Sequence, residues 1–124
     1  MRVYKVKPFA RFQRRERISD QALCQAVAEA ERGLVEADLG GGLVKQRLAR
    51  PGAGKRGGYR TVIAYRRGDR SFFLLGFAKS DRENIDDGEL AALKVQGKAI
   101  LGLDAKQIEE LIADDKLTEV HCDW

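Results

Sequence analysis

The middle of the chain holds the side chains with the clearest chemical potential, which are lysines and arginines. Residues 43–82 carry 11 basic and 2 acidic groups, and residues 83–124 carry 4 basic and 11 acidic ones, although the 124-residue chain has a net charge of only +4. This segregation indicates a polyanionic partner for the basic segment. Cations of this kind suit RNA cleavage, in which the RNA's own 2′-OH attacks the adjacent phosphate and the extra negative charge is stabilised.

A glycine-flanked loop, Pro-Gly-Ala-Gly-Lys-Arg at 51–56, lies inside this segment. It is not a P-loop, because Ala49 stands where the first glycine belongs and Arg56 replaces the Ser or Thr that would hold magnesium. Its backbone N–H groups, with Lys55 and Arg56, still favour close contact with a phosphate. The alternative, a hairpin loop kept soluble by its charges, stays open.

Three further cations lie within or beside apolar runs: Lys45, Arg60 and Lys79. A cation in such a position needs a partner. Strand alternation places Arg60 on the face opposite Tyr59. Three neighbouring antiparallel strands would gather these cations on one surface, together with the RNA-binding candidates Arg47, Arg50 and Arg56.

Other catalytic sets are missing from the sequence. There is no nucleophile elbow, and a single histidine, His121, excludes a His–His nuclease pair. Besides lysine, arginine and tyrosine, only Asp81 and Glu83 could contribute to chemistry near the basic segment. The cluster His121-Cys122-Asp123 has too few ligands for a metal site, so we expect neither a metal nor a cofactor.

The N-terminal residues have no apolar core of signal-peptide type, and no run approaches the ~18 apolar residues of a membrane span. We therefore expect a cytoplasmic protein. A reducing compartment and a core of adequate size predict that Cys24 and Cys122 do not form a disulfide. Cys24 lies on an apolar helical stripe and is expected to pack in the core.

The hydrophobic pattern predicts the elements that position these residues. Residues 3–6 suit a strand, Pro8 the first turn of a helix, and Ser19 or Asp20 the N-cap of a second helix, whose apolar stripe comprises Leu23, Val27, Ala30 and Leu34. Strands follow at 43–48, 59–66 and 71–79, and Gly68 supplies the positive φ of the last hairpin. The run at 71–79 is typical of a central strand buried on both faces.

The acidic end is expected to be helical and packed on the body. Asp86 with Glu89, and Asp104 with Gln107, have the spacing of capping boxes, while residues 117–121 suit a short strand or coil. With 44% hydrophobic and 34% charged residues and a mean hydropathy of −0.41, the chain is neither disordered nor fibrous. We predict one α+β domain over 1–124: a strand and helix pair, an antiparallel sheet core, then C-terminal helices.

Three stretches carry a resemblance to a known family: Gly41–Arg47, then Gly54-Lys55-Arg56-Gly57-Gly58-Tyr59-Arg60, then Phe77–Asp81. The chain resembles the RelE/HigB toxins of bacterial type II toxin–antitoxin systems over residues 1 to about 102, with residues 104–124 as a C-terminal helical extension. The resemblance implies a RelE-like fold of microbial-ribonuclease type. It also implies a ribosome-dependent mRNA interferase that inhibits translation, needs no metal, and is neutralised by a cognate antitoxin.

By position, the resemblance carries the catalytic group over to Lys45, Lys55, Arg60 and Lys79, with Tyr59 and Asp81 as additional RNA contacts. Arg60 and Lys45 are expected to bind the scissile phosphate, Lys55 to position the RNA or take the 2′-OH proton, and Lys79 to protonate the leaving oxygen. The partners implied are the antitoxin and mRNA on the ribosome, with no membrane and no small-molecule cofactor. Two alternatives stay open: a ParE-like toxin that inhibits gyrase without nuclease activity, and a non-enzymatic nucleic-acid-binding module.

Overall fold

The computed structural model describes residues 1–50 and 54–124, and only the backbone of residues 50 and 54–57 is described. In this part of the chain, six strands form one sheet in the order β2-β3-β4-β5-β1-β6. The strands are β1 (Arg2–Val6), β2 (Ala37–Gly40), β3 (Leu43–Arg50), β4 (Gly54–Arg66), β5 (Arg70–Ala78) and β6 (Leu117–Val120). The helices are α1 (Lys7–Glu16), α2 (Asp20–Glu31), α3 (Asp87–Leu101) and α4 (Ala105–Ala113).

The α+β prediction is confirmed, but the sheet is mixed rather than purely antiparallel. Strands β3, β4 and β5 are antiparallel neighbours, as expected, and the hairpin between β4 and β5 turns at Gly68 with a φ of 73°. Strand β1 pairs parallel to β5, with Val3 opposite Ser71. A parallel pair requires a crossover, and here the chain crosses over through α1, α2 and the three following strands.

The start of the sheet differs from the prediction at two places. Strand β2 was not expected, because its four residues lack β-branched or aromatic side chains. It pairs antiparallel to β3 across a turn that contains Gly41 and Gly42, both at positive φ. Strand β4 begins at Gly54, so the flexible loop expected over 50–58 is strand from residue 54 onward. Residues 51–53 of that loop lie outside the described residues.

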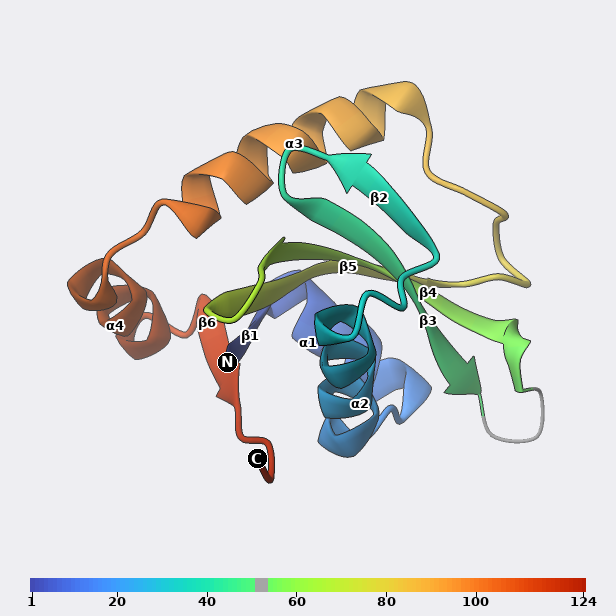
Figure 1. The fold of residues 1–124 in the computed structure, drawn as a ribbon, viewed down its shortest axis with the longest axis horizontal. Helices are drawn as coiled ribbons and strands as arrows, with labels where there is room; N and C mark the ends of the chain where they lie inside the picture. Colours follow the sequence, from blue (N-terminus) through green and yellow to red (C-terminus); the bar gives the residue numbers. More distant parts are fainter. Residues whose placement is uncertain (51–53) are drawn as a thin grey trace.

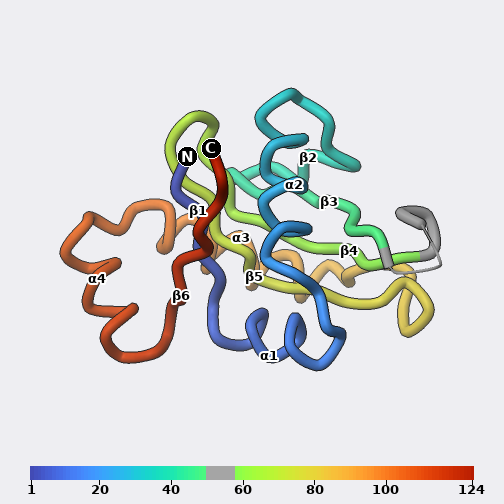
Figure 2. Tube along the Cα trace, turned by 90° about the horizontal axis from the view of Figure 1, so that it is seen from below, coloured from blue at the N-terminus to red at the C-terminus, as the bar shows by residue number. Residues whose placement is uncertain are grey.

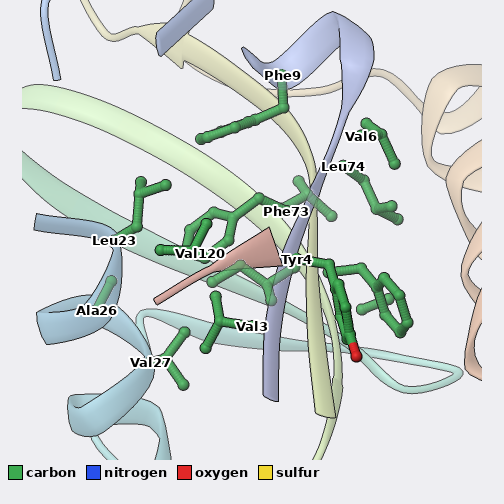
Figure 3. Close-up of a cluster of buried hydrophobic side chains, with 14 of the residues drawn as sticks. Val3, Tyr4, Val6, Phe9, Leu23, Ala26, Val27, Phe73, Leu74 and Val120 are labelled. Carbon is green, nitrogen blue, oxygen red and sulfur yellow. The ribbon is translucent and has the colours of Figure 1, made fainter. Parts of the chain in front are cut away.

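The helices cover both faces of the sheet (Figure 1). On one face lie α1 and α2, where Phe9 and Phe12 pack so closely that a Cβ on Gly76 of β5 would lie 2.4 Å from the Phe12 ring. On the other face lies α3, where Gly97 lets the helix approach Leu43 and Ala64. Figure 3 shows Leu23, Ala26 and Val27 of α2 directed at Val3 and Val120 of the sheet.

The predicted helix signals are largely confirmed. The Ser19 hydroxyl caps α2 by accepting a bond from the Ala22 N–H, and Asp104 with Gln107 forms a complete capping box at α4. Asp86 caps α3 through the Glu89 N–H, but the Glu89 carboxylate pairs with Arg82 instead of closing the box. Leu34 is not part of the α2 stripe: the helix ends at Glu31, and Leu34 is 53% exposed.

The end of the chain is fixed to the body, and one prediction about it is wrong. Strand β6 pairs antiparallel to β1 at the sheet edge, and the two termini lie close together (Figure 2). Cys24 of α2 and Cys122, just after β6, form a disulfide with their Cα atoms 5.7 Å apart. The prediction of unpaired cysteines relied on compartment and core size, and sequence separation could not show that the two lie side by side. No helix in the described ranges is long and apolar enough to cross a membrane.

Candidate RNA-binding face

Three of the predicted cations, Lys45, Arg47 and Arg60, lie on the sheet face that also carries α3. Leu43, Lys45 and Arg47 alternate along β3, and Leu43 contacts α3 at Gly97. Arg47 lies opposite Arg60 of β4, which in turn lies opposite Phe77 of β5. Because cross-strand partners share a face, these residues form a row across three strands. We call the region of Lys45, Arg47, Arg60, Phe77 and the segment 79–86 the basic face.

Arg60 is the most buried residue of the basic face. It is 1% exposed, and its Nε lies 3.0 Å from Glu36 Oε2. Its guanidinium also donates to the Tyr59 carbonyl oxygen over 3.3 Å. For Arg60, the expectation that a cation within an apolar run has a partner is therefore confirmed. The sequence predicts Arg60 as an open phosphate-binding fork, whereas in the structure its side chain is buried and paired with Glu36.

Arg47, which lies opposite Arg60 on the neighbouring strand β3, is the more exposed of the two arginines. Its side chain is 45% exposed, and its Nε lies 3.4 Å from Glu36 Oε1. The Glu36 carboxylate therefore lies between the buried guanidinium of Arg60 and the exposed guanidinium of Arg47. It contacts Arg47 through Nε and leaves the two terminal nitrogens on the other side. Among the described residues, the terminal nitrogens of Arg47 have no hydrogen-bond partner, so this fork can receive an anion.

The segment that joins β5 to α3 borders the basic face. The Lys45 Nζ donates to Asn84 Oδ1 over 3.1 Å, which ties β3 to this segment. The Arg82 guanidinium lies 4.5 Å from the centre of the Phe77 ring and pairs with Glu89 of α3 over 2.8 Å. A cation over an aromatic face is a favourable contact, and this one also satisfies the charge of Arg82.

The other predicted residues fall in different environments. Lys79 and Asp81 are exposed in the turn after β5, and the Lys79 side chain has no hydrogen bond or ion pair in the described part of the chain. Tyr59 is 2% exposed and packs edge-on against Phe12 on the opposite face. Because the core covers the Tyr59 ring, a nucleobase of the RNA cannot stack on it. The side chains of Arg50, Lys55 and Arg56 lie outside the described residues.

Sequence reasoning missed Glu36, Arg82 and Asn84 as parts of this face. The rule that a buried cation needs a partner indicates that an acid must exist, but not which one. Glu36 is separated from Arg60 by 24 positions, and it reaches the site only because the unexpected strand β2 folds back along β3. No group of three or more His, Cys, Asp or Glu that could hold a metal occurs in the ranges that the structure describes.

A mixed six-stranded sheet with helices on both faces and a cationic row across β3 and β4 defines a small α+β protein of RelE-like fold. The chain belongs to the RelE family: a family model described as "RelE toxin of RelE / RelB toxin-antitoxin system" matches residues 1–120. The protein is therefore a toxin of a toxin–antitoxin system, and its family implies an antitoxin partner. The match extends beyond residue 102, so α4 and β6 lie within it. No curated protein matches the chain significantly.

Proposed function

We propose that this toxin is a metal-independent endoribonuclease that cleaves mRNA on the ribosome and is held inactive by its cognate antitoxin. The observation that carries the proposal is the cationic row on the basic face, where Lys45 and Arg47 lie on one face of β3, with Lys79 in the turn directly after β5. A toxin that inhibits gyrase without contacting an RNA phosphate has no need of cations gathered in this way, whereas a nucleic-acid-binding module would share them. Membership of the RelE family supports the same conclusion.

In this proposal the RNA supplies its own nucleophile. The 2′-OH attacks the adjacent phosphate, and Lys45 with the outer edge of Arg47 stabilises the added negative charge of the transition state. Lys79 protonates the leaving 5′ oxygen, while Lys55 positions the RNA or takes the 2′-OH proton. The products are a 2′,3′-cyclic phosphate and a 5′-OH, and no metal takes part.

The burial of Arg60 supports a different role for it from phosphate binding. A planar guanidinium grips a phosphate best with two nitrogens at once, and the terminal nitrogens of Arg47 have no hydrogen-bond partner among the residues that the structure describes. Arg60 instead acts through Glu36, which holds Arg47 in place. Arg47 is therefore the phosphate fork in this proposal, and Arg60 is a positioning residue.

The test is a translation extract programmed with a defined mRNA, to which the purified chain is added with and without its antitoxin. We expect new 5′ ends at positions in register with the codons, mapped by primer extension, and none when the antitoxin is present. Naked RNA should be cut far more slowly. The 5′ ends should carry a hydroxyl, so they accept phosphate from a polynucleotide kinase without prior phosphatase treatment.

Two other outcomes would replace the proposal. If the mRNA stays intact while the chain inhibits supercoiling by purified gyrase, the ParE-like alternative is correct. If the chain binds RNA in a salt-dependent manner without forming any product, it is a binding module. A matched control, Lys106→Ala on α4, changes an exposed lysine remote from the basic face and should behave like the parent chain.

A further inference from the structure

The disulfide between Cys24 and Cys122 lies at a surface cavity that the proposed nuclease chemistry does not use. The cavity has a volume of about 420 Å³ and is lined by both cysteines together with Gln21, Gln25, His121 and Trp124, among others. Both cysteines are only partly buried, and His121 and Trp124 are exposed. The disulfide therefore lies at a surface cavity whose volume can hold a small molecule.

The disulfide closes a large part of the chain into a ring. The cysteines are 98 positions apart, so the ring contains every element from the second turn of α2 to β6. It adds a covalent tie at the sheet edge, where β6 is held by four paired residues of β1 and Trp124 donates to the Met1 carbonyl oxygen over 3.3 Å. A cross-link over so long a loop restricts the unfolded chain strongly and so stabilises the fold.

The disulfide is also separate from the basic face. Cys24 belongs to α2, which covers the sheet face opposite the one that carries Lys45 and Arg47 (Figure 1). None of the residues that line the cavity touches the cationic row through a hydrogen bond or ion pair in the described part of the chain. Opening the disulfide should therefore change how long the folded protein persists without changing the geometry of the row.

We propose that Cys24–Cys122 is a thiol–disulfide exchange site for low-molecular-weight thiols, and that the exchange sets the lifetime of the folded toxin. A small thiolate enters the cavity and attacks one sulfur; the S–S bond breaks, a mixed disulfide forms, and the other cysteine leaves as a thiolate. A second small thiolate then releases the first as a small-molecule disulfide. The two small thiols lose two electrons in total, and the two cysteines gain them.

The test uses the full chain, oxidised and then equilibrated with glutathione buffers of graded ratio under native conditions. We expect no free thiol in the oxidised chain, two free thiols at high reduced glutathione, and a glutathionyl adduct on the chain in acid-quenched samples by mass spectrometry. The fully reduced form should unfold on the order of 10 °C lower than the oxidised form. Native protease digestion should be roughly tenfold faster or more.

Two results would overturn the proposal. One is a native oxidised preparation that already contains two free thiols. The other is a disulfide that resists glutathione until a denaturant unfolds the chain, which would show that the cavity gives no access. The double variant C24S/C122S is the matched control and should unfold like the reduced parent at every glutathione ratio. If that variant does not fold, the oxidised and reduced forms of the parent still decide the question, and neither result depends on RNA cleavage.

Discussion

Because the ion pair between Arg60 and Glu36 is largely buried, we expect Arg60 to contribute to the stability of the fold. An exposed arginine can be truncated with little effect on folding, but removal of one partner of a buried pair leaves an uncompensated charge. Arg60 is 1% exposed and the Glu36 side chain is 18% exposed. We therefore expect Arg60→Met to lower the free energy of unfolding by about 3–5 kcal/mol, measured by urea denaturation.

A second substitution separates the charge from the packing. Arg60→Met would leave the Glu36 carboxylate with only its 3.4 Å contact to the exposed Arg47. Glu36→Gln removes that charge, so the double variant should regain part of the lost stability. The coupling free energy from the double-mutant cycle should therefore be clearly different from zero. If the two single effects simply add, the pair contributes nothing beyond its separate side chains and the account of Arg60 fails.

Substitutions of Lys45 and Lys79 test the proposed cleavage mechanism most directly. Each lysine supplies one charge to the proposed transition state, and loss of one such donor costs roughly 2–4 kcal/mol, or about 30- to 1,000-fold in rate. Lys45→Ala and Lys79→Ala should therefore reduce cleavage by that factor in the programmed extract, with unfolding midpoints close to that of the parent. Unchanged cleavage in both variants, next to an active Lys106→Ala control, would place the site elsewhere.

The raised pKa of Tyr65 leads us to expect that the stability of the fold depends on pH in the alkaline range. Burial, with the hydrogen bond to Glu31 and the charge of that carboxylate, raises the pKa of Tyr65 to about 12. A tyrosine in the unfolded chain loses its proton near a pKa of about 10. Between these values the native state holds a proton that the unfolded state has lost, so stability falls as the pH rises through this window.

The comparison of Tyr65→Phe with the parent isolates this effect from other groups that titrate at high pH. Phenylalanine has no proton to lose, so the variant should lose less stability than the parent between about pH 9 and about pH 11. Urea unfolding at each pH measures the difference. Equal losses in both proteins would mean that Tyr65 titrates alike in the folded and unfolded chain.

At the scale of elements, the packing of α3 on the sheet depends on one glycine. A Cβ on Gly97 would lie 2.7 Å from Leu43 Cδ2, whereas a Cβ on Gly88 in the same helix would meet only Asp86 Oδ1 at 3.5 Å. Alanine favours a helix over glycine by up to about 1 kcal/mol at either position. We expect Gly88→Ala to be neutral or stabilising and Gly97→Ala to be destabilising in thermal unfolding. A stabilising Gly97→Ala would show that α3 does not pack this closely.

Most elements could be predicted because their signals are local. Pro8, Ser19 and Asp104 mark helix starts through their own backbone chemistry, and the apolar run at 71–79 matches a central strand. Strand β2 could not be predicted, because it exists through pairing with β3 and not through its own propensity. The same holds for the parallel pairing of β1 with β5, which unites residues almost 70 positions apart.

The candidate site was predictable in composition but not in arrangement. The alternation of β3 predicts that Lys45 and Arg47 share one face of the sheet, and the structure places both on it. Which arginine is open and which is buried depends on where Glu36 lies, and that follows from the placement of β2. The Cys24–Cys122 disulfide is a further case, since only the folded chain places α2 beside the end of β6.

At the scale of the whole molecule, the segregation of charge along the chain becomes a segregation across the surface. The basic face is built mainly from the central strands. Acidic residues already occur in its 79–86 segment, as Asp81 and Glu83, and they continue at Asp87 and Glu89 of α3. The ion pair from Glu89 to Arg82 and the bond from Lys45 to Asn84 fix this boundary. A polyanion is therefore attracted to one side of α3 and repelled along the helix start, which orients it over Lys45 and Lys79.

The antitoxin must compete with RNA for this surface if it inhibits by direct cover. A buried interface between like charges is costly, so the antitoxin segment over the basic face should be acidic there. Lysine modification of the free toxin and of the complex, read by mass spectrometry, tests this. Lys45 and Lys79 should be protected in the complex, whereas Lys106 on α4 should react equally in both. If Lys79 reacts fully in the complex, the antitoxin instead inhibits by making the toxin too bulky for the ribosome.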